Sequence, residues 1–428
     1  MHRLVRPSNH RTITAGAIAT ASLLAAMATA RAGEWPQILG PTRSGVAAAD
    51  ERLAPVWPAE GPRVVWRRPV GSGCAGVAVA EGRAILFHRV DDREVVEALD
   101  AATGELLWSD GHPTSFRPQV GGGDGPLCTP VVQDGRVISF GPQGILACVD
   151  LKTGRRLWQR DTHREFGAQE GYFGAGSTPL VIGDRVIVNV GGSRQDAGIV
   201  AFAAGSGETL WQATAEPASY SAPVAAAVAD LGDGKGLPQA LVVSRYRCQL
   251  VDPTDGTIRW QVPFGMRGPT VNAATPLVIE DRLLLTASYG IGSICARFDR
   301  AGTTVLWEGS DSLATQYCTP IAIDGHLYAI DGRDDIPPAD LKCIDLATGR
   351  VAWIERDFGY GTLLAADGKL LATKTDGELL MLEASPRGVK VLSRCRPLDG
   401  GIRALPALAA GRLYLRDDRS LVCLDLSR

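Results

Sequence analysis

The stretch Asp100-Ala-Ala-Thr103-Gly104-Glu-Leu-Leu-Trp108 is one copy of a short turn that is followed, eight residues after its Asp, by a tryptophan. The same spacing recurs in Asp150–Trp158, Asp252–Trp260, Asp299–Trp307 and Asp345–Trp353, and without the Asp in Ala203–Trp211. The Asp carboxylate accepts hydrogen bonds from the backbone two residues on, and the Gly supplies the positive φ of a tight turn. The repeat therefore predicts a series of hairpins, each with a tryptophan on its second strand.

A second hairpin precedes each of these turns. Apolar strands flank Asp-Gly in Pro130-Val-Val-Gln-Asp134-Gly135-Arg-Val-Ile and in Pro320-Ile-Ala-Ile-Asp324-Gly325-His-Leu-Tyr. Each period thus holds four strands, and after residue 30 no stretch of useful length has the apolar i, i+3, i+4 spacing of a helix. Periods of about 40–50 residues with four strands each are typical of a β-propeller, so the sequence predicts an all-β fold.

The number of repeats predicts eight blades. Six units match the pattern well, at residues 74–110, 128–161, 177–214, 221–262, 274–311 and 318–357. A weaker seventh unit, 361–397, keeps the spacing from Glu383 to Val391 without Asp or Trp, and the eighth, 404–428, has room for only three strands. The missing strand is available in 63–69, which carries Trp66 without a turn before it. We expect this N-terminal strand to join the C-terminal blade and close the ring of four-stranded antiparallel blades. Seven blades is the alternative, if the seventh unit is incomplete.

The first 32 residues are predicted to be a signal peptide. Arg3, Arg6 and Arg11 precede an uncharged run over 12–30, and Ala28-Thr-Ala30 and Ala30-Arg-Ala32 are suitable cleavage sites. A retained membrane anchor is the alternative. Residues 33–62 are then an N-terminal extension and 63–428 the propeller. The mature protein is expected to be exported, to the periplasm or outside the cell, and soluble without stable membrane insertion.

The composition argues against a nucleic-acid partner and a metal centre. The net charge is −3, whereas nucleic-acid-binding proteins usually carry a basic stripe. The nine cysteines form no Cys-x-x-Cys pair. Cys148, Cys343 and Cys423 each stand two residues before a turn Asp, as expected of small core residues, although a thiol cluster or metal site near the channel is the alternative. The acidic loops 230–236 and 331–340 are weak candidates for calcium, and no metal is predicted.

The unit of strand, Asp-x-x-Thr-Gly turn and tryptophan resembles the pyrroloquinoline-quinone-type propeller repeat. Quinoprotein dehydrogenases share this repeat with the propeller subunit of the outer-membrane β-barrel assembly machinery. The opening Trp35-Pro36-Gln-Ile-Leu-Gly40-Pro41-Thr-Arg-Ser-Gly45 also resembles the start of exported bacterial members. The resemblance implies that the repeat tryptophans are structural and pack between adjacent blades: Trp66, Trp108, Trp158, Trp211, Trp260, Trp307 and Trp353.

The resemblance also bears on the cofactor. The dehydrogenases of this family hold the quinone against two adjacent cysteines and a calcium ion bound by Glu, Asn and Asp. This chain has no Cys-Cys pair, and none of its motifs matches those calcium ligands. No cofactor is therefore predicted, and pyrroloquinoline quinone with calcium is expected only if the protein is an oxidoreductase.

Any binding site is expected in the loops that join consecutive blades, because these loops meet at one mouth of the channel. The longest is 161–176. The candidate ligand-binding residues of all these loops are Arg117, Asp124, His163, Arg164, Glu165, Glu170, Tyr172, Arg267, Asn272, Gln316, Tyr317, Tyr360 and Arg403. Arg, Tyr and carboxylates suit a polar ligand or an acidic peptide. A rim whose charges only solvate the loops is the alternative, and His163 with Glu165 or Glu170 is a candidate acid–base pair.

The sequence as a whole predicts an exported, non-catalytic scaffold, monomeric, that binds a protein or a cell-envelope polymer through its loop faces. The hypothesis rests on repeats that cover nearly the whole chain and on the lack of any recognisable catalytic motif. Two alternatives remain. One is a pyrroloquinoline-quinone-dependent dehydrogenase of alcohols or sugars, and the other is a propeller that binds a carbohydrate or another small ligand.

Overall fold

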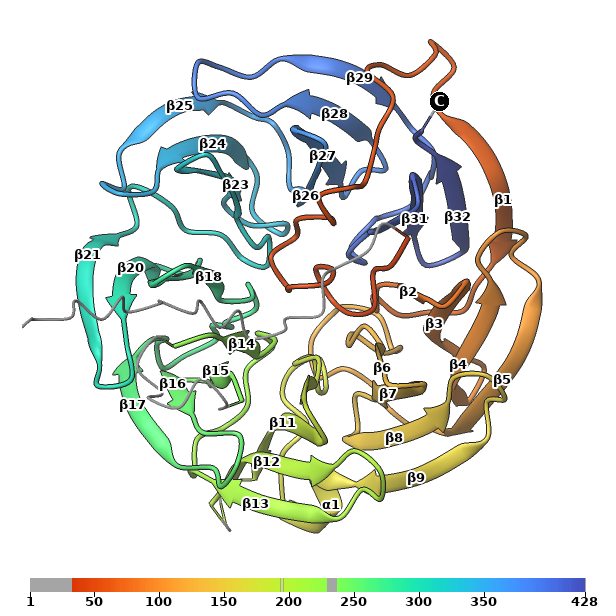
Figure 1. The fold of residues 1–428 in the computed structure, drawn as a ribbon, viewed down its shortest axis with the longest axis vertical. Helices are drawn as coiled ribbons and strands as arrows, with labels where there is room; N and C mark the ends of the chain where they lie inside the picture. The colour runs from red at the N-terminus through yellow and green to blue at the C-terminus, as the bar shows by residue number, and fades with distance from the viewer. Residues whose placement is uncertain (1–32, 193, 195, 229–236, 428) are drawn as a thin grey trace, which may run out of the picture.

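The computed structural model describes residues 33–427 except 193, 195 and 229–236. The predicted signal peptide, residues 1–32, and the acidic loop 230–236 lie outside the described residues. Eight antiparallel sheets of four strands each are arranged around a central channel (Figure 1). The prediction of an all-β, eight-bladed propeller is confirmed.

The strands follow the chain blade by blade. The first four blades are β2–β5 (Ala78–Ala80, Arg83–Val90, Arg93–Asp100, Leu106–Pro113), β6–β9 (Val131–Gln133, Arg136–Phe140, Ile145–Asp150, Arg156–Asp161), β10–β13 (Leu180–Ile182, Arg185–Gly192, Ala197–Ala203, Thr209–Ala213) and β14–β17 (Val224–Ala226, Gln239–Val243, Arg247–Val251, Ile258–Pro263). The next three are β18–β21 (Leu277–Ile279, Arg282–Ala287, Gly292–Phe298, Thr303–Gly309), β22–β25 (Ile321–Ile323, His326–Asp331, Asp340–Asp345, Val351–Glu355) and β26–β29 (Gly361–Ala366, Lys369–Lys374, Leu379–Glu383, Val391–Cys395). The weak seventh unit is thus a complete blade.

The eighth blade is built from both ends of the described chain. It contains β30 (Ala407–Ala409), β31 (Arg412–Arg416) and β32 (Ser420–Asp425), and its outermost strand is β1 (Arg63–Pro69). β1 pairs with β32 in antiparallel register, with Trp66 opposite Cys423. The prediction that an N-terminal strand closes the ring is confirmed.

The tryptophans of the repeat join each blade to the next. Trp108 of the first blade donates its indole N–H to the carbonyl oxygen of Leu151 in the second, at 2.8 Å. Gly154 of that second blade lies against the same ring, since a Cβ added to it would stand 2.7 Å from Trp108. The corresponding bonds run from Trp66 to Ala101, Trp158 to Ala204, Trp211 to Pro253, Trp260 to Asp299, Trp307 to Leu346 and Trp353 to Ser385. Seven contacts of one kind therefore hold the ring together.

The cysteines are core residues of the blades. Cys148, Cys343 and Cys423 lie on the third strand of their blades and stand opposite Trp158, Trp353 and Trp66 in the register. All nine cysteines are free, and seven are buried. The other blades have Ala or Cys opposite their tryptophan, except the fourth, where Leu250 stands opposite Trp260. These cysteines therefore pack as ordinary apolar side chains beside the tryptophan of the neighbouring strand.

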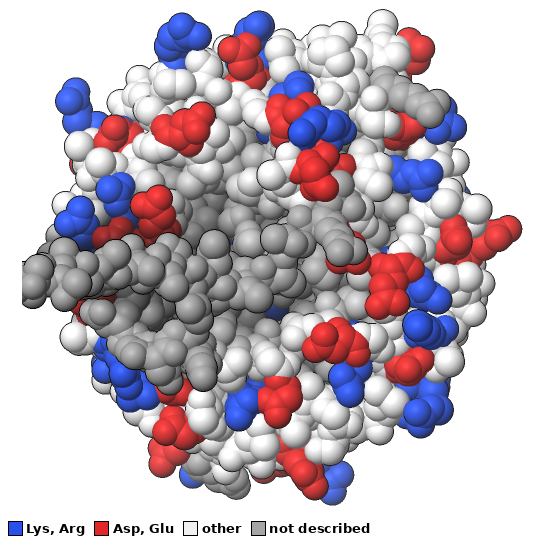
Figure 2. Space-filling model, viewed as in Figure 1, with Lys and Arg blue, Asp and Glu red and all other residues white. Residues whose placement is uncertain are grey.

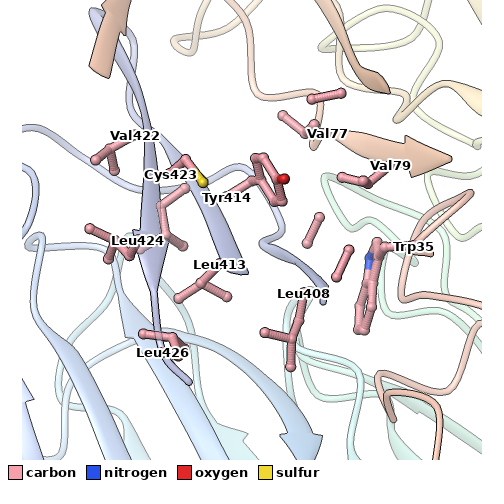
Figure 3. Packing of buried hydrophobic residues seen from close by; sticks show 14 of the residues in the cluster. Trp35, Val77, Val79, Leu408, Leu413, Tyr414, Val422, Cys423, Leu424 and Leu426 are labelled. Carbon is pink, nitrogen blue, oxygen red and sulfur yellow. The ribbon is translucent and has the colours of Figure 1, made fainter. Parts of the chain in front are cut away.

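One continuous core cluster joins the eighth blade to the first. Figure 3 shows Leu413, Tyr414 and Cys423 of the eighth blade facing Val79 of the first, with Trp35 of the extension beside them. Trp35 is only 1% exposed. The extension is therefore part of the core of the folded ring.

The sequence patterns missed one short helix. α1 (Thr162–Phe166) follows β9, with Asp161 as its N-cap and Gly167 in the left-handed conformation at its C-terminus. Five residues are too few to show an apolar period, which explains the omission. In the described part of the chain, no helix is long and apolar enough to cross a membrane.

Candidate functional site

All thirteen predicted loop residues lie at one mouth of the channel, which we call the connector mouth. It is formed by the segments between blades (70–77, 114–130, 162–179, 214–223, 264–276, 310–320, 356–360 and 396–406) and by the turns between second and third strands. Neighbouring strands of a blade are antiparallel, so the turns between first and second strands lie at the opposite mouth. The predicted residues come from six connectors and are spread around the ring.

The predicted acid–base residues of the longest connector have structural contacts. His163 is buried and packs edge-on against Phe140. Its ring also lies so close to Gly144 that a Cβ added to that glycine would stand 2.3 Å from it. Burial lowers the pKa of His163, and the negative charge of Glu170 opposes this shift. Glu165 forms an ion pair with Arg160, and Glu170 accepts a hydrogen bond from Gln143 at 3.0 Å. The structure therefore does not present His163 with either Glu as an exposed pair.

An aromatic cluster covers the following part of this connector. Tyr172 and Phe173 meet edge to face, and the ring centroid of Phe173 lies 5.8 Å from that of Tyr220 on the next connector. The Tyr220 hydroxyl accepts a hydrogen bond from the Phe173 amide at 3.0 Å. The Tyr172 carbonyl accepts one from the amide of Gln119, at 2.9 Å, on the preceding connector. Three successive connectors are thus held together here, with their aromatic side chains half-buried.

Asn272 and Tyr360 hold the connectors in place. The Asn272 amide nitrogen donates to the carbonyl oxygens of Ser244 and Arg245, each at 3.1 Å. The Tyr360 hydroxyl, in a side chain that is only 5% exposed, accepts hydrogen bonds from the amides of Tyr317 and Cys318 at 2.7 and 3.1 Å. Both side chains point into the protein and satisfy its backbone, so neither is available to a ligand at the surface.

Residues of the hairpin turns complete the mouth, and the sequence analysis did not select them. Gln316 donates to the Tyr289 hydroxyl at 2.8 Å, and the Arg333 guanidinium stacks over the Tyr289 ring at 4.2 Å. Arg403 forms an ion pair with Asp334 at 2.9 Å, which bridges the connector before the eighth blade to a turn of the sixth. Tyr289 and Arg333 could have been chosen from the sequence only by searching the turns between the second and third strands of each unit for aromatic and cationic residues.

A cleft of about 580 Å³ opens at the connector mouth between the sixth, seventh, eighth and first blades. Its lining includes Cys74, Asp376, Arg403, Arg416 and Asp418. Arg416 is 1% exposed and donates to the carbonyl oxygens of Gly71 and Phe87, and burial lowers its pKa to about 10. The guanidinium therefore stays charged at neutral pH but its donors are occupied.

Three more predicted residues lie beside this cleft. Asp124 accepts a hydrogen bond from the Ser72 hydroxyl at 2.6 Å, and Arg117 lies 3.7 Å from the same carboxylate. The Tyr317 hydroxyl is buried without a hydrogen-bond partner among the described residues, and burial raises the pKa of Tyr317. The cleft thus combines carboxylates, guanidinium groups and glycine backbone.

The acidic loop 331–340 is not arranged as a calcium site. Each of its four carboxylates faces a cation: Asp331 pairs with Lys342, Asp334 with Arg403, Asp335 with Arg333 and Asp340 with Arg356. Calcium ligands must instead converge several oxygens on one point. Within the described residues, no three His, Cys, Asp or Glu side chains form a group that could hold a metal ion.

Comparison with known proteins places the chain in a family. The family model described as outer membrane protein assembly factor BamB matches residues 92–355, more than half of the chain. The chain belongs to this family. Among known relatives, the outer membrane protein assembly factor BamB of Moranella endobia is 24% identical over 60% of this chain, and the match spans 64% of that protein, just under two thirds of its length.

Solved structures show the same fold in proteins with different names. The crystal structure of BamB from Moraxella catarrhalis superposes with a TM-score of 0.62 at 17% identity, covering 85% of this chain and 99% of that one. Quinohemoprotein alcohol dehydrogenase from Comamonas testosteroni gives 0.66 at 15% identity, covering 94% and 82%. At such identities the superpositions establish the fold alone, so function must be argued from the residues of the connector mouth.

Proposed function

We propose that this protein is an exported, non-catalytic propeller that binds a protein partner through its connector mouth. Membership in the BamB family supports a scaffold role. The observation that carries the proposal is the character of this mouth: apolar and aromatic side chains surrounded by arginines, while the candidate acid–base residues are occupied in the fold.

The proposed docking surface is an arc of Val120, Tyr172, Phe173, Tyr220, Arg245, Met266 and Arg267, which we call the connector arc. Val120 and Met266 are 53% and 44% exposed, although both are large apolar side chains. The arc is continuous, because the Tyr220 amide donates to the carbonyl oxygen of Asn272 at 2.9 Å and Arg245 donates to that of Gly268 at 2.6 Å. Aromatic residues, Met and Arg are enriched in the centres of protein interfaces.

The charges of the arc favour an acidic partner. Arg267 is exposed, and so is Arg164 on the neighbouring helix α1, and neither forms an ion pair with any described carboxylate. Arg245 donates only to backbone carbonyls. The nearby acids Glu165 and Glu216 are already paired with Arg160 and Arg247. An acidic, partly apolar segment of a partner would therefore find uncompensated guanidinium groups beside apolar contacts.

The rim of the face shown in Figure 2 offers no comparable charge. On the face shown in Figure 2, Lys and Arg are interspersed with Asp and Glu around the rim and no patch of one sign is seen. This distribution, with a net charge of −3, supports a partner other than nucleic acid.

The quinone-dependent alternative is supported by the fold and by sequence similarity of about a third of this chain to quinone-dependent alcohol dehydrogenases. The cleft at the connector mouth contains Cys74 alone, whereas the dehydrogenases use two adjacent cysteines and a calcium site. The four carboxylates of the loop 331–340 are each paired with a cation. These residues do not fit a quinone and its calcium ion. The carboxylates of the cleft, Asp376 and Asp418, suit sugar hydroxyls and support a carbohydrate as the second candidate ligand.

Site-specific photo-crosslinking tests the proposal. A photoreactive amino acid replaces Met266 on the connector arc or, as the control, Leu107 on the outer strand β5, which is similarly exposed at 48%. We expect one discrete protein adduct in cells from position 266 and none from 107. Arg267→Glu should weaken this adduct, whereas Arg350→Glu, on an outer turn, should leave it unchanged. Adducts from position 107 alone would contradict the proposal. Thermal stabilisation by pyrroloquinoline quinone and calcium together with dye reduction by alcohols would establish the alternative.

A further inference from the structure

The extension crosses the middle of the ring (Figure 1), and its bonds to Asp367 and Ala410, in turns between first and second strands, place it at the mouth opposite the connectors. Trp35 exchanges two backbone hydrogen bonds with Val79 on the innermost strand β2 of the first blade, at 2.7 and 2.8 Å. The Pro36 carbonyl accepts from Val132 of the second blade at 2.8 Å. Farther along, Ala47 donates to Ala365 of the seventh blade at 2.8 Å. The segment is thus bonded to innermost strands of the first, second and seventh blades.

Arg43 secures the segment between the third and fourth blades. Its side chain is only 2% exposed, and its guanidinium donates to the carbonyl oxygens of Thr178, Pro179 and Pro223, the last at 2.7 Å. The Nε–H donates to the side-chain oxygen of Gln37 at 2.8 Å. Burial lowers the pKa of Arg43 to about 9, so the group is still charged at neutral pH. A buried charge is tolerated only when it is well bonded, and here carbonyl dipoles of two blades supply the bonds.

The sequence of the extension is suited to this place. Gly40 lies against the ring of Trp35, and a Cβ on Gly45 would stand 2.4 Å from Ile321 of the sixth blade. Leu39 and Arg43 both have φ of +57°, a conformation that non-glycine residues rarely adopt. Such tight turns allow a short segment to fold into the mouth of the channel. The contacts therefore account for the Trp-Pro-x-x-x-Gly-Pro-x-x-x-Gly pattern, which the repeats do not explain.

The extension also completes the interface between the seventh and eighth blades. The register of the seventh blade places Ser393 where the others have tryptophan, opposite Met381. The Ser393 hydroxyl accepts from the Trp57 amide at 2.8 Å, and Trp57 is buried in the core cluster of these blades. Glu51, only 3% exposed, accepts from the amide of Ala410 in the first turn of the eighth blade at 3.2 Å.

We propose that residues 33–57 are a built-in peptide ligand of the ring, which occupies a binding site formed by the innermost strands and closes this mouth of the channel. The site recognises a segment of tight turns with a tryptophan at one end and an arginine inserted between two blades. The channel is then accessible only from the connector mouth. This role is independent of any partner bound there.

Cleavage of the chain behind the segment tests the proposal. Residues 58–60 are exposed, so a protease site is introduced after Glu60 in the full-length protein and the chain is cut. We expect the segment to remain bound after the cut and to co-elute with the ring in size-exclusion chromatography. Release of the segment from the cut wild-type ring would overturn the proposal, because the segment would then be held only by its covalent link.

Arginine variants locate the binding determinant. Arg43→Met should increase dissociation of the cut segment roughly tenfold or more, because three buried carbonyls lose their donor. Arg52→Met is the matched control, since Arg52 is exposed and donates only to Ala49 and Glu51 nearby, and it should not change dissociation. Equal dissociation of the two variants would refute the role of Arg43.

If the cut variant unfolds, a second measurement on the uncut protein tests the same proposal. In the uncut protein, hydrogen exchange measures the protection of the amides of Ala47 and Ala365, which are bonded across the interface. The variant is Arg43→Lys, which replaces the several donors of the guanidinium by a single ammonium group. The proposal predicts faster exchange at these two amides and unchanged exchange in the outer strands. Unchanged exchange at both amides would contradict it.

Discussion

A single methyl group tests the contact that joins the blades. Gly154 has φ of +71°, and a Cβ at this position would stand 2.7 Å from the indole of Trp108. Gly154→Ala therefore has two costs. The left-handed backbone conformation costs an L-residue about 1–2 kcal/mol, and forcing a methyl into a packed contact costs about 1–3 kcal/mol more.

Gly135→Ala separates these two costs. Gly135 has nearly the same φ, +70°, but a Cβ there would meet nothing within 4 Å. This variant has only the backbone cost, and the change in unfolded-state entropy is the same for both. We therefore expect Gly154→Ala to reduce the free energy of unfolding by about 1–3 kcal/mol more than Gly135→Ala does. Urea unfolding at equilibrium, followed by circular dichroism, measures both values.

The outcome that would refute the reasoning is an equal loss of stability in the two variants. It would mean that the Trp108 ring moves freely and does not join the blades. A further check is Gly154→Ala in a Trp108→Leu background. If the indole is the cause of the extra cost, the cost of the methyl should fall toward that of Gly135→Ala, because the two changes are coupled.

Three other outcomes are expected. Trp158→Ala should reduce the free energy of unfolding by about 3–5 kcal/mol, since it removes a buried ring, and an unchanged melting temperature would argue against burial between blades. Trp57→Ala should have a cost of about 3–5 kcal/mol as well, with hydrogen exchange accelerated first in β29 and β32; uniform acceleration would contradict a local role. The hydroxyl of Thr348 lowers the pKa of Asp345 in the folded protein by donating a hydrogen bond to its carboxylate. The ionised Asp345 therefore stabilises the fold fully above the unfolded Asp pKa of about 3.9, and this stabilisation is lost as the pH falls through the lower folded pKa. The stability of Asp345→Asn, by urea midpoints from pH 7 to 2.5, should approach that of wild type at the acid end, and a constant difference would refute this linkage.

The blades could be predicted from the sequence because their determinants are local. The Asp100 carboxylate accepts hydrogen bonds from the amides of Ala102 and Thr103 at 2.8 and 2.9 Å, so the turn is encoded within a few residues. Even the seventh blade, without Asp or Trp, kept a continuous apolar strand, Leu379–Leu382, whose four side chains are all buried in the cores on its two faces. Ring closure could be predicted as well, because the strand that carries Trp66 belongs to no unit of its own and the last unit has room for only three strands.

The candidate site could not be predicted in the same way, because connector side chains have no period. His163, Asn272 and Tyr360 look like ligand-binding residues in the sequence, and only the packing shows that they bond or contact the protein itself. The role of the extension was not foreseen for a related reason. Arg43 contacts residues 135 to 180 positions away, and no local pattern reports such contacts.

The two mouths of the channel differ for a physical reason. The seven tryptophan contacts are of one kind and do not make one mouth different from the other. The extension lies at one mouth and the connectors at the opposite one, so these segments make the two mouths different. At one end, a buried arginine satisfies the carbonyls of two blades, so those groups are unavailable to a partner. At the other mouth, the Arg267 guanidinium has no carboxylate partner among the described residues, and the Met266 side chain is exposed. Binding energy is available where polar and apolar groups are still unsatisfied, and the connector mouth is therefore the face on which a partner would be expected to bind.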